Sequence, residues 1–185
     1  MLKIAYHPIY KHELPENHRF PMEKYDLLPQ QLLYEGTCIE ENFFEPEIPN
    51  NKHFFTVHDP EYFFDLLNIT LSQKAARKIG FPLSEVLVAR EMIIADGTIK
   101  ASEFALKNGI AMNIAGGTHH AFSSRGEAFC MLNDQAIGAK YLQQKSLAKK
   151  ILIVDLDVHQ GNGTAEIFQN DSSIFTFSMH GKSNY

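Results

Sequence analysis

The sequence predicts an α/β fold in which helices flank a mainly parallel β-sheet. Short runs rich in β-branched residues alternate along the chain with longer segments of helical periodicity, as in successive βαβ units. The run Ile151–Val154 is apolar throughout, which is typical of a central strand covered on both faces. A chain of 185 residues with 44% hydrophobic content can form one domain with a substantial core. We therefore expect a single domain over residues 1–185, whose sheet continues beyond Tyr185.

The first half of the chain is expected to contain two strands and three helices. They are a strand over Lys3–Tyr6, a helix over Met22–Glu35, a strand over His53–Val57, a helix from Asp59 through Asn68 and a helix over Ser72–Gly80. Pro29 should break or kink the first helix, because proline lacks a backbone N–H and clashes with the preceding turn. Asp59-Pro60 supplies an N-cap and an N1 proline, while Ser72 and Gly80 mark the ends of the third helix. Residues 36–52 are acidic and contain two prolines, which predicts a loop with a short strand.

The second half is expected to alternate between helix and strand. Its elements are a helical segment over Pro82–Asn108, a strand over Ile110–Ile114, a helix over Leu132–Lys145, the strand at Ile151–Val154, a helix over Thr164–Phe168 and a strand over Ile174–Ser178. Asp96-Gly97 interrupts the first of these, so we expect two helices or one bent helix, ended by Gly109 as a C-cap. Residues 115–130 are rich in Gly, Ser and His and are expected to form a long loop.

Composition and charge exclude several classes of protein. A net charge of −5, a pI near 6.0 and the lack of a Lys/Arg run argue against a direct nucleic-acid partner. No apolar run reaches the roughly 18 residues that a membrane span needs, and the N-terminus lacks the apolar core of a signal peptide. Cys38 and Cys130 are too few for a disulfide framework, so a reducing cytoplasm is the expected location.

The central strand runs directly into Asp155, Asp157 and His159, which share one face while the backbone stays extended. Ligands of open α/β sheets bind just beyond the carboxyl ends of the strands. Carboxylates and an imidazole placed there predict a metal site of the Zn or Fe type, because a cation removes the cost of burying an unpaired carboxylate. The aspartates could instead accept hydrogen bonds that cap the following turn. If Asp157 and His159 bind zinc, a third protein ligand must come from elsewhere.

A second cluster, Gly116-Gly117-Thr118-His119-His120-Ala121, also follows a predicted strand. Adjacent histidines on a glycine-rich loop could be metal ligands, a general base with its neighbour, or ordinary surface histidines. Their position beside a second polar strand end favours a functional role. A general base tuned near neutral pH is what metal-assisted hydrolysis requires.

Together these motifs resemble the histone deacetylase family of the arginase/deacetylase superfamily. The resemblance rests on Gly-Gly-x-His-His-Ala at 116–121, Phe129-Cys130, and Val-Asp-Leu-Asp-x-His-x-Gly-x-Gly at 154–163, and it covers essentially the whole chain. Gln160 and Asn162 are most similar to the class IV branch and its bacterial relatives. The resemblance implies a three-layer fold and a zinc-dependent amidohydrolase that removes acetyl or longer acyl groups. Its substrate would be an acylated lysine peptide or a small acylated amine.

The resemblance also implies a role for each residue of the two motifs. Asp157 and His159 would bind Zn²⁺. His120 would act as general base on the zinc-bound water, with His119 as its electrostatic or acid partner. Asp155 would pair with His119.

The sequence departs from the family pattern in three places. Asn162 stands where many relatives have an aspartate behind the general-base histidine, which predicts a less basic His120 because an amide stabilises the charged ring less. Ala128 stands where Gly is usual before Phe-Cys, so we expect crowding at the tunnel lip. The family's third zinc ligand, an aspartate, and its carbonyl-polarising tyrosine are expected beyond Tyr185.

The remaining implied residues belong to the substrate tunnel and to structural cations. Phe129 would form one wall of an acyl-lysine tunnel, next to Gly117 and Ala128, and Arg19 would line an acetate exit channel. A structural K⁺ would be held by the Asp155 carboxylate, the Ser178 hydroxyl and backbone oxygens of Asp157, His159 and Met179. A second such site would use backbone oxygens near Phe168, Asp171 and Ile174.

Two other functions stay open from the residues alone. A strand that ends in Asp-x-Asp also occurs in Mg²⁺-dependent phosphohydrolases with an aspartyl nucleophile, although these lack a paired-histidine loop ahead of it. The chain could also be a non-catalytic fragment that binds a metal or a partner without the third zinc ligand and the tyrosine. The oligomeric state is not indicated by the sequence.

Overall fold

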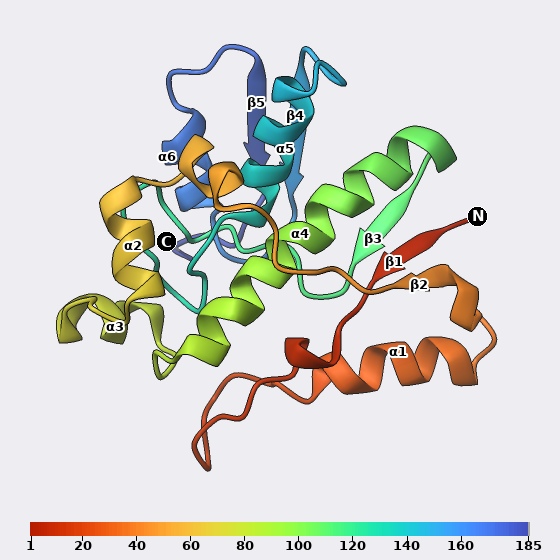
Figure 1. Cartoon of the computed structure of the whole chain (residues 1–185), viewed down its shortest axis with the longest axis horizontal. Coiled ribbons are helices and arrows are strands. Elements are labelled where there is room, and N and C mark those ends of the chain that lie inside the picture. Colours follow the sequence, from red (N-terminus) through yellow and green to blue (C-terminus); the bar gives the residue numbers. More distant parts are fainter. Residues whose placement is uncertain (185) are drawn as a thin grey trace.

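Short parallel strands and a layer of helices make up the computed structural model, which describes residues 1–184 (Figure 1). The elements in chain order are β1 (Lys3–Ala5), η1 (Pro8–Tyr10), α1 (Lys24–Tyr34), η2 (Glu40–Asn42), β2 (Phe43–Phe44), η3 (Asn51–Thr56), α2 (Pro60–Leu67), α3 (Gln73–Ile79), α4 (Glu85–Asn108), β3 (Ala111–Asn113), α5 (Asp134–Gln144), β4 (Ile151–Asp155), α6 (Asn162–Phe168) and β5 (Ile174–Ser178). The three elements marked η are 3₁₀ helices. The predicted α/β class with parallel strands is confirmed.

The strands form two sheets over residues 1–184. In the first, β1 lies between β2 and β3, and Ile4 is opposite both Phe43 and Met112. In the second, β4 pairs with β5 along its whole length, from Ile151 opposite Ile174 to Asp155 opposite Ser178. Helix α4 packs on β1 and β3 and also on α5; α5 contacts α6, which packs on β5, so these helices connect the two sheets.

Several predicted helix ends are confirmed by their caps. The Asp59 side chain accepts the backbone N–H of Glu61 at the start of α2, and the Ser72 hydroxyl accepts that of Ala75 in α3. Gly80 and Gly109 close α3 and α4 with φ of +87° and +86°, which glycine adopts at little cost. The predicted short strand within residues 36–52 is β2.

The strand predicted over His53–Val57 is wrong, because this segment forms the 3₁₀ helix η3. The Asn50 side chain accepts the backbone N–H of Lys52 and starts the helical turn. Phe54 then points into the core, where its ring stacks on that of Phe63 at 4.7 Å. The segment therefore forms a helical turn that buries Phe54 and leaves Phe55 exposed.

Of the two alternatives predicted at Asp96-Gly97, two separate helices is wrong, since α4 continues from Glu85 to Asn108. A Cβ atom on Gly97 would lie 2.5 Å from the Tyr10 hydroxyl and 2.8 Å from Asn113 Nδ2. Glycine is present because η1 and β3 pass close to the helix, and packing offsets its low helix propensity. Pro29 likewise lies inside α1 without ending it.

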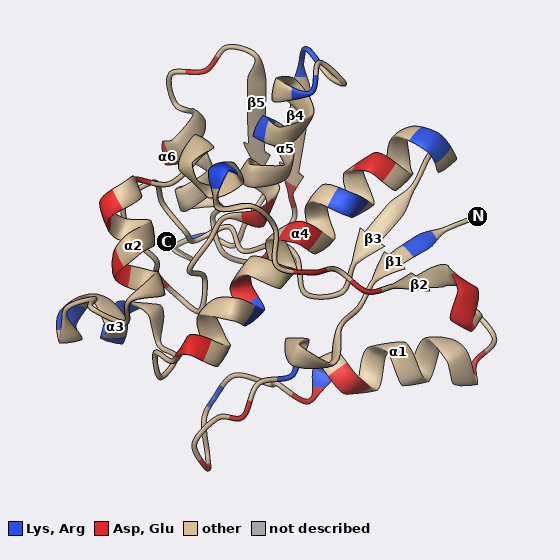
Figure 2. Cartoon of the chain, viewed as in Figure 1, with Lys and Arg blue, Asp and Glu red and all other residues tan. Residues whose placement is uncertain are grey.

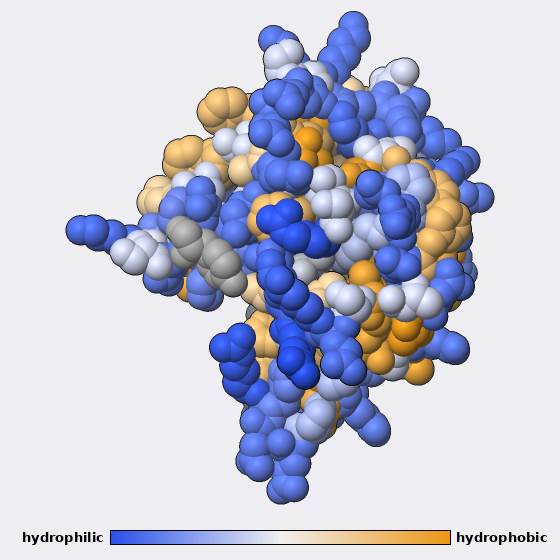
Figure 3. All heavy atoms as spheres, turned by 90° about the vertical axis from the view of Figure 1, so that its left-hand side faces the viewer, coloured by the Kyte–Doolittle hydropathy of each residue, from blue (hydrophilic) through white to orange (hydrophobic). Residues whose placement is uncertain are grey.

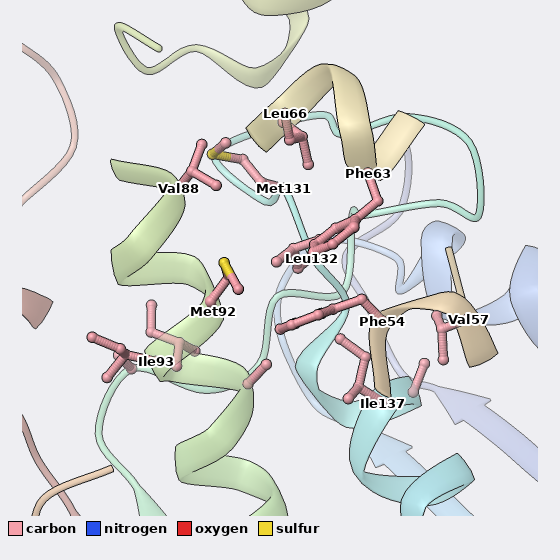
Figure 4. Close-up of a cluster of buried hydrophobic side chains, with 14 of the residues drawn as sticks. Phe54, Val57, Phe63, Leu66, Val88, Met92, Ile93, Met131, Leu132 and Ile137 are labelled. Carbon is pink, nitrogen blue, oxygen red and sulfur yellow. The ribbon is translucent and has the colours of Figure 1, made fainter. Parts of the chain in front are cut away.

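One cluster of buried apolar side chains joins the helical elements (Figure 4). Figure 4 shows side chains from several regions meeting in this cluster: Phe54 and Val57 of the η3 region, Phe63 and Leu66 of α2, Val88, Met92 and Ile93 of α4, Met131 and Leu132 of the loop before α5, and Ile137 of α5. Because Met131 and Leu132 are anchored here, the polar loop that surrounds them is held in place.

Charged residues are spread over the molecule (Figure 2). In the view of Figure 2, Lys and Arg alternate with Asp and Glu along most helices and loops and form no extended basic cluster. The face shown in Figure 3 is mostly hydrophilic and is broken by separate hydrophobic patches. Among the described residues, no helix combines the length and the apolar character that a membrane span requires.

Candidate active site

Successive hydrogen bonds link the residues at the carboxyl end of β4 to the histidine loop. Asp155 is buried, and one carboxylate oxygen accepts a 2.5 Å hydrogen bond from Nδ1 of His119 while the other accepts the backbone N–H of Asp157 at 3.0 Å. Asp157 in turn accepts the backbone N–H of His159 at 2.7 Å, and the same oxygen lies 3.0 Å from His159 Nδ1. The strand end and the histidine loop therefore meet.

The loop that carries the histidines is held by the buried carboxylate of Asp134. Its oxygens accept the backbone N–H groups of Gly117 and Thr118, at 3.0 and 2.8 Å, and the hydroxyls of Thr118 and Thr98, at 2.6 and 2.5 Å. A Cβ atom on Gly116 would lie 2.8 Å from this carboxylate. A buried carboxylate that accepts several hydrogen bonds is held in one orientation, so it fixes the position of the histidine loop.

A second buried anchor is His58. Its Nδ1 donates to the carbonyl of Phe122, and its Nε2 accepts the backbone N–H of Asn133, both at 3.0 Å. The Asn133 amide then donates to the carbonyl of Ala121 and lies 3.0 Å from the Thr164 hydroxyl, which joins the loop to α6. Burial lowers the pKa of His58 to about 4, so the ring is neutral at pH 7.

Two glycines allow α6 to approach the site closely. A Cβ atom on Gly161 would lie 2.3 Å from Asp155 Oδ2, and one on Gly163 would lie 2.5 Å from the carbonyl oxygen of Ala121 and 2.7 Å from that of His119. The backbone N–H of Thr164 donates to the same His119 carbonyl. The glycines of this motif are thus needed for packing against the histidine loop.

His120 faces the Asp157–His159 pair. Its Nδ1 donates a 2.8 Å hydrogen bond to Asn162 Oδ1, which assigns the lone pair to Nε2. Its ring centroid lies 4.1 Å from that of His119 and 5.9 Å from that of His159. Burial lowers the pKa of His120, and the neighbouring histidines act in the same direction, so the neutral form dominates at pH 7.

The Asp157–His159 pair has the donor chemistry of a zinc site. Zinc binds carboxylate oxygen and imidazole nitrogen and usually takes three protein ligands in a catalytic site. His159 donates to Asp157, and these hydrogen bonds hold the pKa of Asp157 below its ordinary value although burial opposes ionisation. Across residues 1–184, no group of three or more His, Cys, Asp or Glu side chains forms a closed metal site. Within residues 1–184, the cleft therefore supplies two zinc donors, Asp157 and His159.

These residues open into a cleft of about 610 Å³. Its walls include every residue assigned to the substrate from the sequence, namely Arg19, Gly117, Ala128 and Phe129, together with His119, His120, Asp157 and His159. Ala128 and Phe129 have φ of +45° and +68° in a tight turn in which the N–H of Cys130 donates to the carbonyl of Glu127. This turn presents the Phe129 ring to the cleft.

The Phe129 ring is part of an aromatic wall. Its centroid lies 5.0 Å from that of Phe81 and 5.1 Å from that of Phe20, and the Arg19 guanidinium lies over the ring at 4.9 Å. Lys24, which the sequence did not single out, also lines the cleft, with its ammonium 4.8 Å from the Phe20 ring centroid. The wall is therefore apolar with two cations beside it.

The residues assigned to monovalent cations lie behind the site. Ser178 is opposite Asp155 in the sheet, its hydroxyl accepts the N–H of Gly161, and Met179 donates its N–H to the Asp155 carbonyl. The second set, Phe168, Asp171 and Ile174, forms the turn between α6 and β5, where the Asp171 carboxylate binds Lys140 and Ser173. Occupation by K⁺ stays a prediction at both places.

Four residues that position the site were missed from the sequence, namely His58, Thr98, Asn133 and Asp134. Asn133 caps α5 through the backbone N–H of Ala136, which explains why this helix begins at Asp134 and not at the predicted Leu132. An Asn-Asp pair before a helix signals a cap, but the pattern does not reveal that Asp134 also binds the loop. Cys130 is buried, and burial raises the pKa of its thiol.

Residues 18–185 match the sequence profile of the histone deacetylase domain. An uncharacterized protein from Picosynechococcus sp. is 48% identical over 182 residues, which are 98% of this chain and 61% of that protein. The crystal structure of an HDAC homolog from Aquifex aeolicus superposes with a TM-score of 0.84 at 28% identity, over 97% of this chain and 50% of its own. A structure of an HDAC homolog complexed with SAHA gives the same values.

The chain therefore belongs to the histone deacetylase family, and its fold is that of the solved homologues. It spans 61% of the length of the Picosynechococcus relative and 50% of the length of the Aquifex homologue.

Proposed function

We propose that this chain carries the proton-transfer residues and two zinc ligands of an amidohydrolase that removes acyl groups from lysine side chains or small acylated amines. The observation that carries the proposal is the meeting of two imidazoles with the Asp157–His159 pair in one cleft. Family membership and the SAHA complex of an HDAC homolog support the same class of reaction.

The histidines have distinct tasks in this proposal. His120, neutral and oriented by Asn162, accepts a proton at Nε2 from the attacking water. His119 donates from Nδ1 to Asp155, and its Nε2 lies 3.8 Å from Asp157. In this proposal His119 is either the electrostatic partner of His120 or the acid that gives a proton to the leaving amine. Zn²⁺ held by Asp157, His159 and a further ligand would polarise the amide carbonyl and lower the pKa of bound water.

The cleft supports an extended, mostly apolar substrate. The methylene stem of an acylated lysine is apolar and its amide tip is neutral, which suits a wall made of Phe20 and Phe129, with Phe81 packed behind the Phe129 ring. Arg19 and Lys24 lie near this wall and would attract the carboxylate that the reaction releases. A small acylated diamine fits the same description, so peptides and small amines are both proposed as substrates.

The test is hydrolysis of an acetyl-lysine peptide and of an acetylated diamine by Zn²⁺-supplemented protein. Among residues 1–184, Asp157 and His159 are the two zinc donors that come together in the cleft. The zinc affinity is therefore measured in parallel by isothermal titration calorimetry. His120→Ala should abolish hydrolysis and leave zinc affinity within about twofold, because His120 is not a ligand. Asp157→Asn should weaken zinc binding by about tenfold or more, since it removes a charged donor.

His12→Ala is the matched control, because His12 lies in the polar loop before α1 and should change neither measurement. Activity retained by His120→Ala would show that the base is wrongly assigned. Mg²⁺-dependent hydrolysis of an aryl phosphate that a hydroxamate does not inhibit would favour the phosphohydrolase alternative. Zinc binding without turnover of any acyl substrate would favour the non-catalytic alternative.

A further inference from the structure

A second hollow lies behind the aromatic wall of the cleft. It is an open groove of about 430 Å³, whose lining includes His18, Gly80 and Phe81. The ring centroids of His18 and Phe81 lie 5.8 and 5.0 Å from that of Phe129, which lines the cleft. The backbone N–H of Phe129 also donates to the carbonyl of Ile79, just before Gly80. The groove and the cleft are therefore separated by the Phe129 ring and the rings packed behind it.

The floor of this groove, which we call the α3 groove, is apolar and held in place by hydrogen bonds. His18 Nε2 donates to the carbonyl of Gly80 at 2.9 Å, and its Nδ1 accepts the backbone N–H of Phe20 at 3.2 Å. Both ring nitrogens are thus used, and the ring stacks on Phe81 with the centroids 5.7 Å apart. Leu83 extends the same floor. A ligand would meet a surface that is already ordered, which lowers the entropic cost of binding.

The polar side of the α3 groove comes from Gln73 and Arg77, and both side chains are exposed. Within residues 1–184, Arg77 forms no ion pair, whereas the next residue, Lys78, binds Glu127 at 3.3 Å. A guanidinium beside an apolar floor suits a ligand side chain that has methylene groups and a terminal carboxylate, because arginine binds carboxylates through paired hydrogen bonds.

Helix α3 is a basic exception in an acidic chain. It contains Lys74, Arg77 and Lys78 and no acidic residue, although the net charge of the chain is −5. Figure 2 shows α3 with blue segments and no red one. Over residues 1–184, Lys78 is the member of this trio that has a carboxylate partner. The charge that remains is positive, so the surface attracts acidic groups and repels basic ones.

We infer that the α3 groove is a subsite of the candidate active site and binds a glutamate side chain two or three residues from the acylated lysine of a peptide substrate. The spacing follows from the two ring separations of 5.0 and 5.7 Å, because an extended peptide spans about 3.3–3.6 Å per residue. This inference rests on the proposed function and narrows it, since acidic peptides are then preferred over small acylated amines.

The experiment measures the affinity of Zn²⁺-supplemented protein for fluorescent acetyl-lysine peptides by anisotropy. Each of four peptides carries one glutamate, at the second or third position before or after the acetyl-lysine, and each has a counterpart with glutamine there. At least one glutamate peptide should bind about threefold to fivefold more tightly than its counterpart, which is the size of an exposed ion pair. The preference should shrink in 0.5 M salt. Equal affinities within all four pairs, or no binding of any peptide, would overturn the inference.

Two variants and a matched control assign the contact to the α3 groove. Arg77→Gln should reduce the preference to less than about twofold, and Gln73→Glu should remove or reverse it, because a carboxylate then faces the acidic side chain. Lys107→Gln should keep the preference, although Lys107 is also an exposed cation in the last turn of a helix. It lies at the end of α4 away from α3 (Figure 1). Circular dichroism checks that each variant is folded, and a preference kept by both groove variants would refute the assignment.

Hydrolysis separates this inference from the proposed function. An acetylated diamine carries no glutamate, so Arg77→Gln should leave its affinity within about twofold. A glutamate preference that depends on Arg77, without turnover of any acyl substrate, would contradict the proposed function and leave the binding groove supported. Hydrolysis of all peptides with no glutamate preference would support the proposed function and overturn the inference. A glutamate peptide that binds equally well with alanine in place of acetyl-lysine would also overturn it, because the groove would then act apart from the cleft.

Discussion

His119 and Asp155 are joined by a 2.5 Å hydrogen bond between Nδ1 and a carboxylate oxygen, and this contact ties the loop after β3 to the end of β4. Both residues are buried, and the second Asp155 oxygen accepts the N–H of Asp157. One carboxylate therefore orients both the His119 ring and the start of the Asp157–His159 segment.

Replacing Asp155 by alanine should lower the free energy of unfolding by about 1–3 kcal/mol, because two donors lose their acceptor in a buried place. Urea denaturation measures the difference. Asp26→Ala is the matched control: Asp26 forms a surface ion pair with Lys11 at 2.8 Å, so the expected loss is about 1 kcal/mol or less. Equal losses in the two variants would contradict the buried role of Asp155.

Acid should destabilise the protein through His58. The folded-state pKa of His58 is about 4, below its ordinary 6.5, because burial disfavours the charged ring. The stability that neutral His58 contributes is complete above pH 6.5 and is lost as the pH falls toward 4, up to about 3 kcal/mol. Urea denaturation at several pH values measures this slope. His58→Gln, which keeps polar groups but does not titrate, should show a flatter slope, and an unchanged slope would refute the prediction.

Ala128→Gly should stabilise the protein by about 1 kcal/mol. Ala128 has φ of +45°, a conformation that costs an L side chain about 1–2 kcal/mol and costs glycine almost nothing. Thermal and urea unfolding measure the gain. Ala165→Gly in α6 is the control with the opposite sign, because glycine inside a helix costs about 1 kcal/mol. A loss of stability in both variants would show that Ala128 is not strained.

Gly163→Ala should destabilise the protein by about 1–3 kcal/mol, although alanine is the better helix former. The added Cβ would lie 2.5 Å from the Ala121 carbonyl oxygen, so α6 must move away from the histidine loop. Unfolding curves give the loss, and the NMR signals of His120 should shift because Asn162 moves with the helix. Unchanged signals and stability would mean that the backbone adjusts freely.

The order of the elements was largely predictable from the sequence. β5 was predicted with its observed bounds, and the caps at Asp59, Ser72, Gly80 and Gly109 followed from local turn chemistry. The failures at 53–57 and 96–97 have one cause. In both places tertiary packing of Phe54 or Gly97 decides the local structure, and a short sequence window does not contain the packing partner.

The candidate site was predictable to the extent that its residues follow strand ends. Both motifs were placed directly after strands, where ligands of α/β sheets bind. The pairing of Asp155 with His119 was implied by the family resemblance, and the hydrogen bond between them agrees. His58 and Asp134 could not be predicted, since their roles depend on which distant backbone groups are buried beside them. The roles of the individual residues in catalysis stay predictions, as does the cytoplasmic location.

The pairing of β1 with β3 has a consequence for folding during synthesis. Ile4 is opposite Met112, whereas Ile153 is opposite Thr176, so the first sheet closes a far longer loop than the second. At ordinary translation speed, on the order of ten seconds separate the synthesis of Ile4 from that of Met112, although Phe43 of β2 is made earlier. The edge of β1 that pairs with β3 is thus exposed to chaperones and proteases for longer than any later part of either sheet.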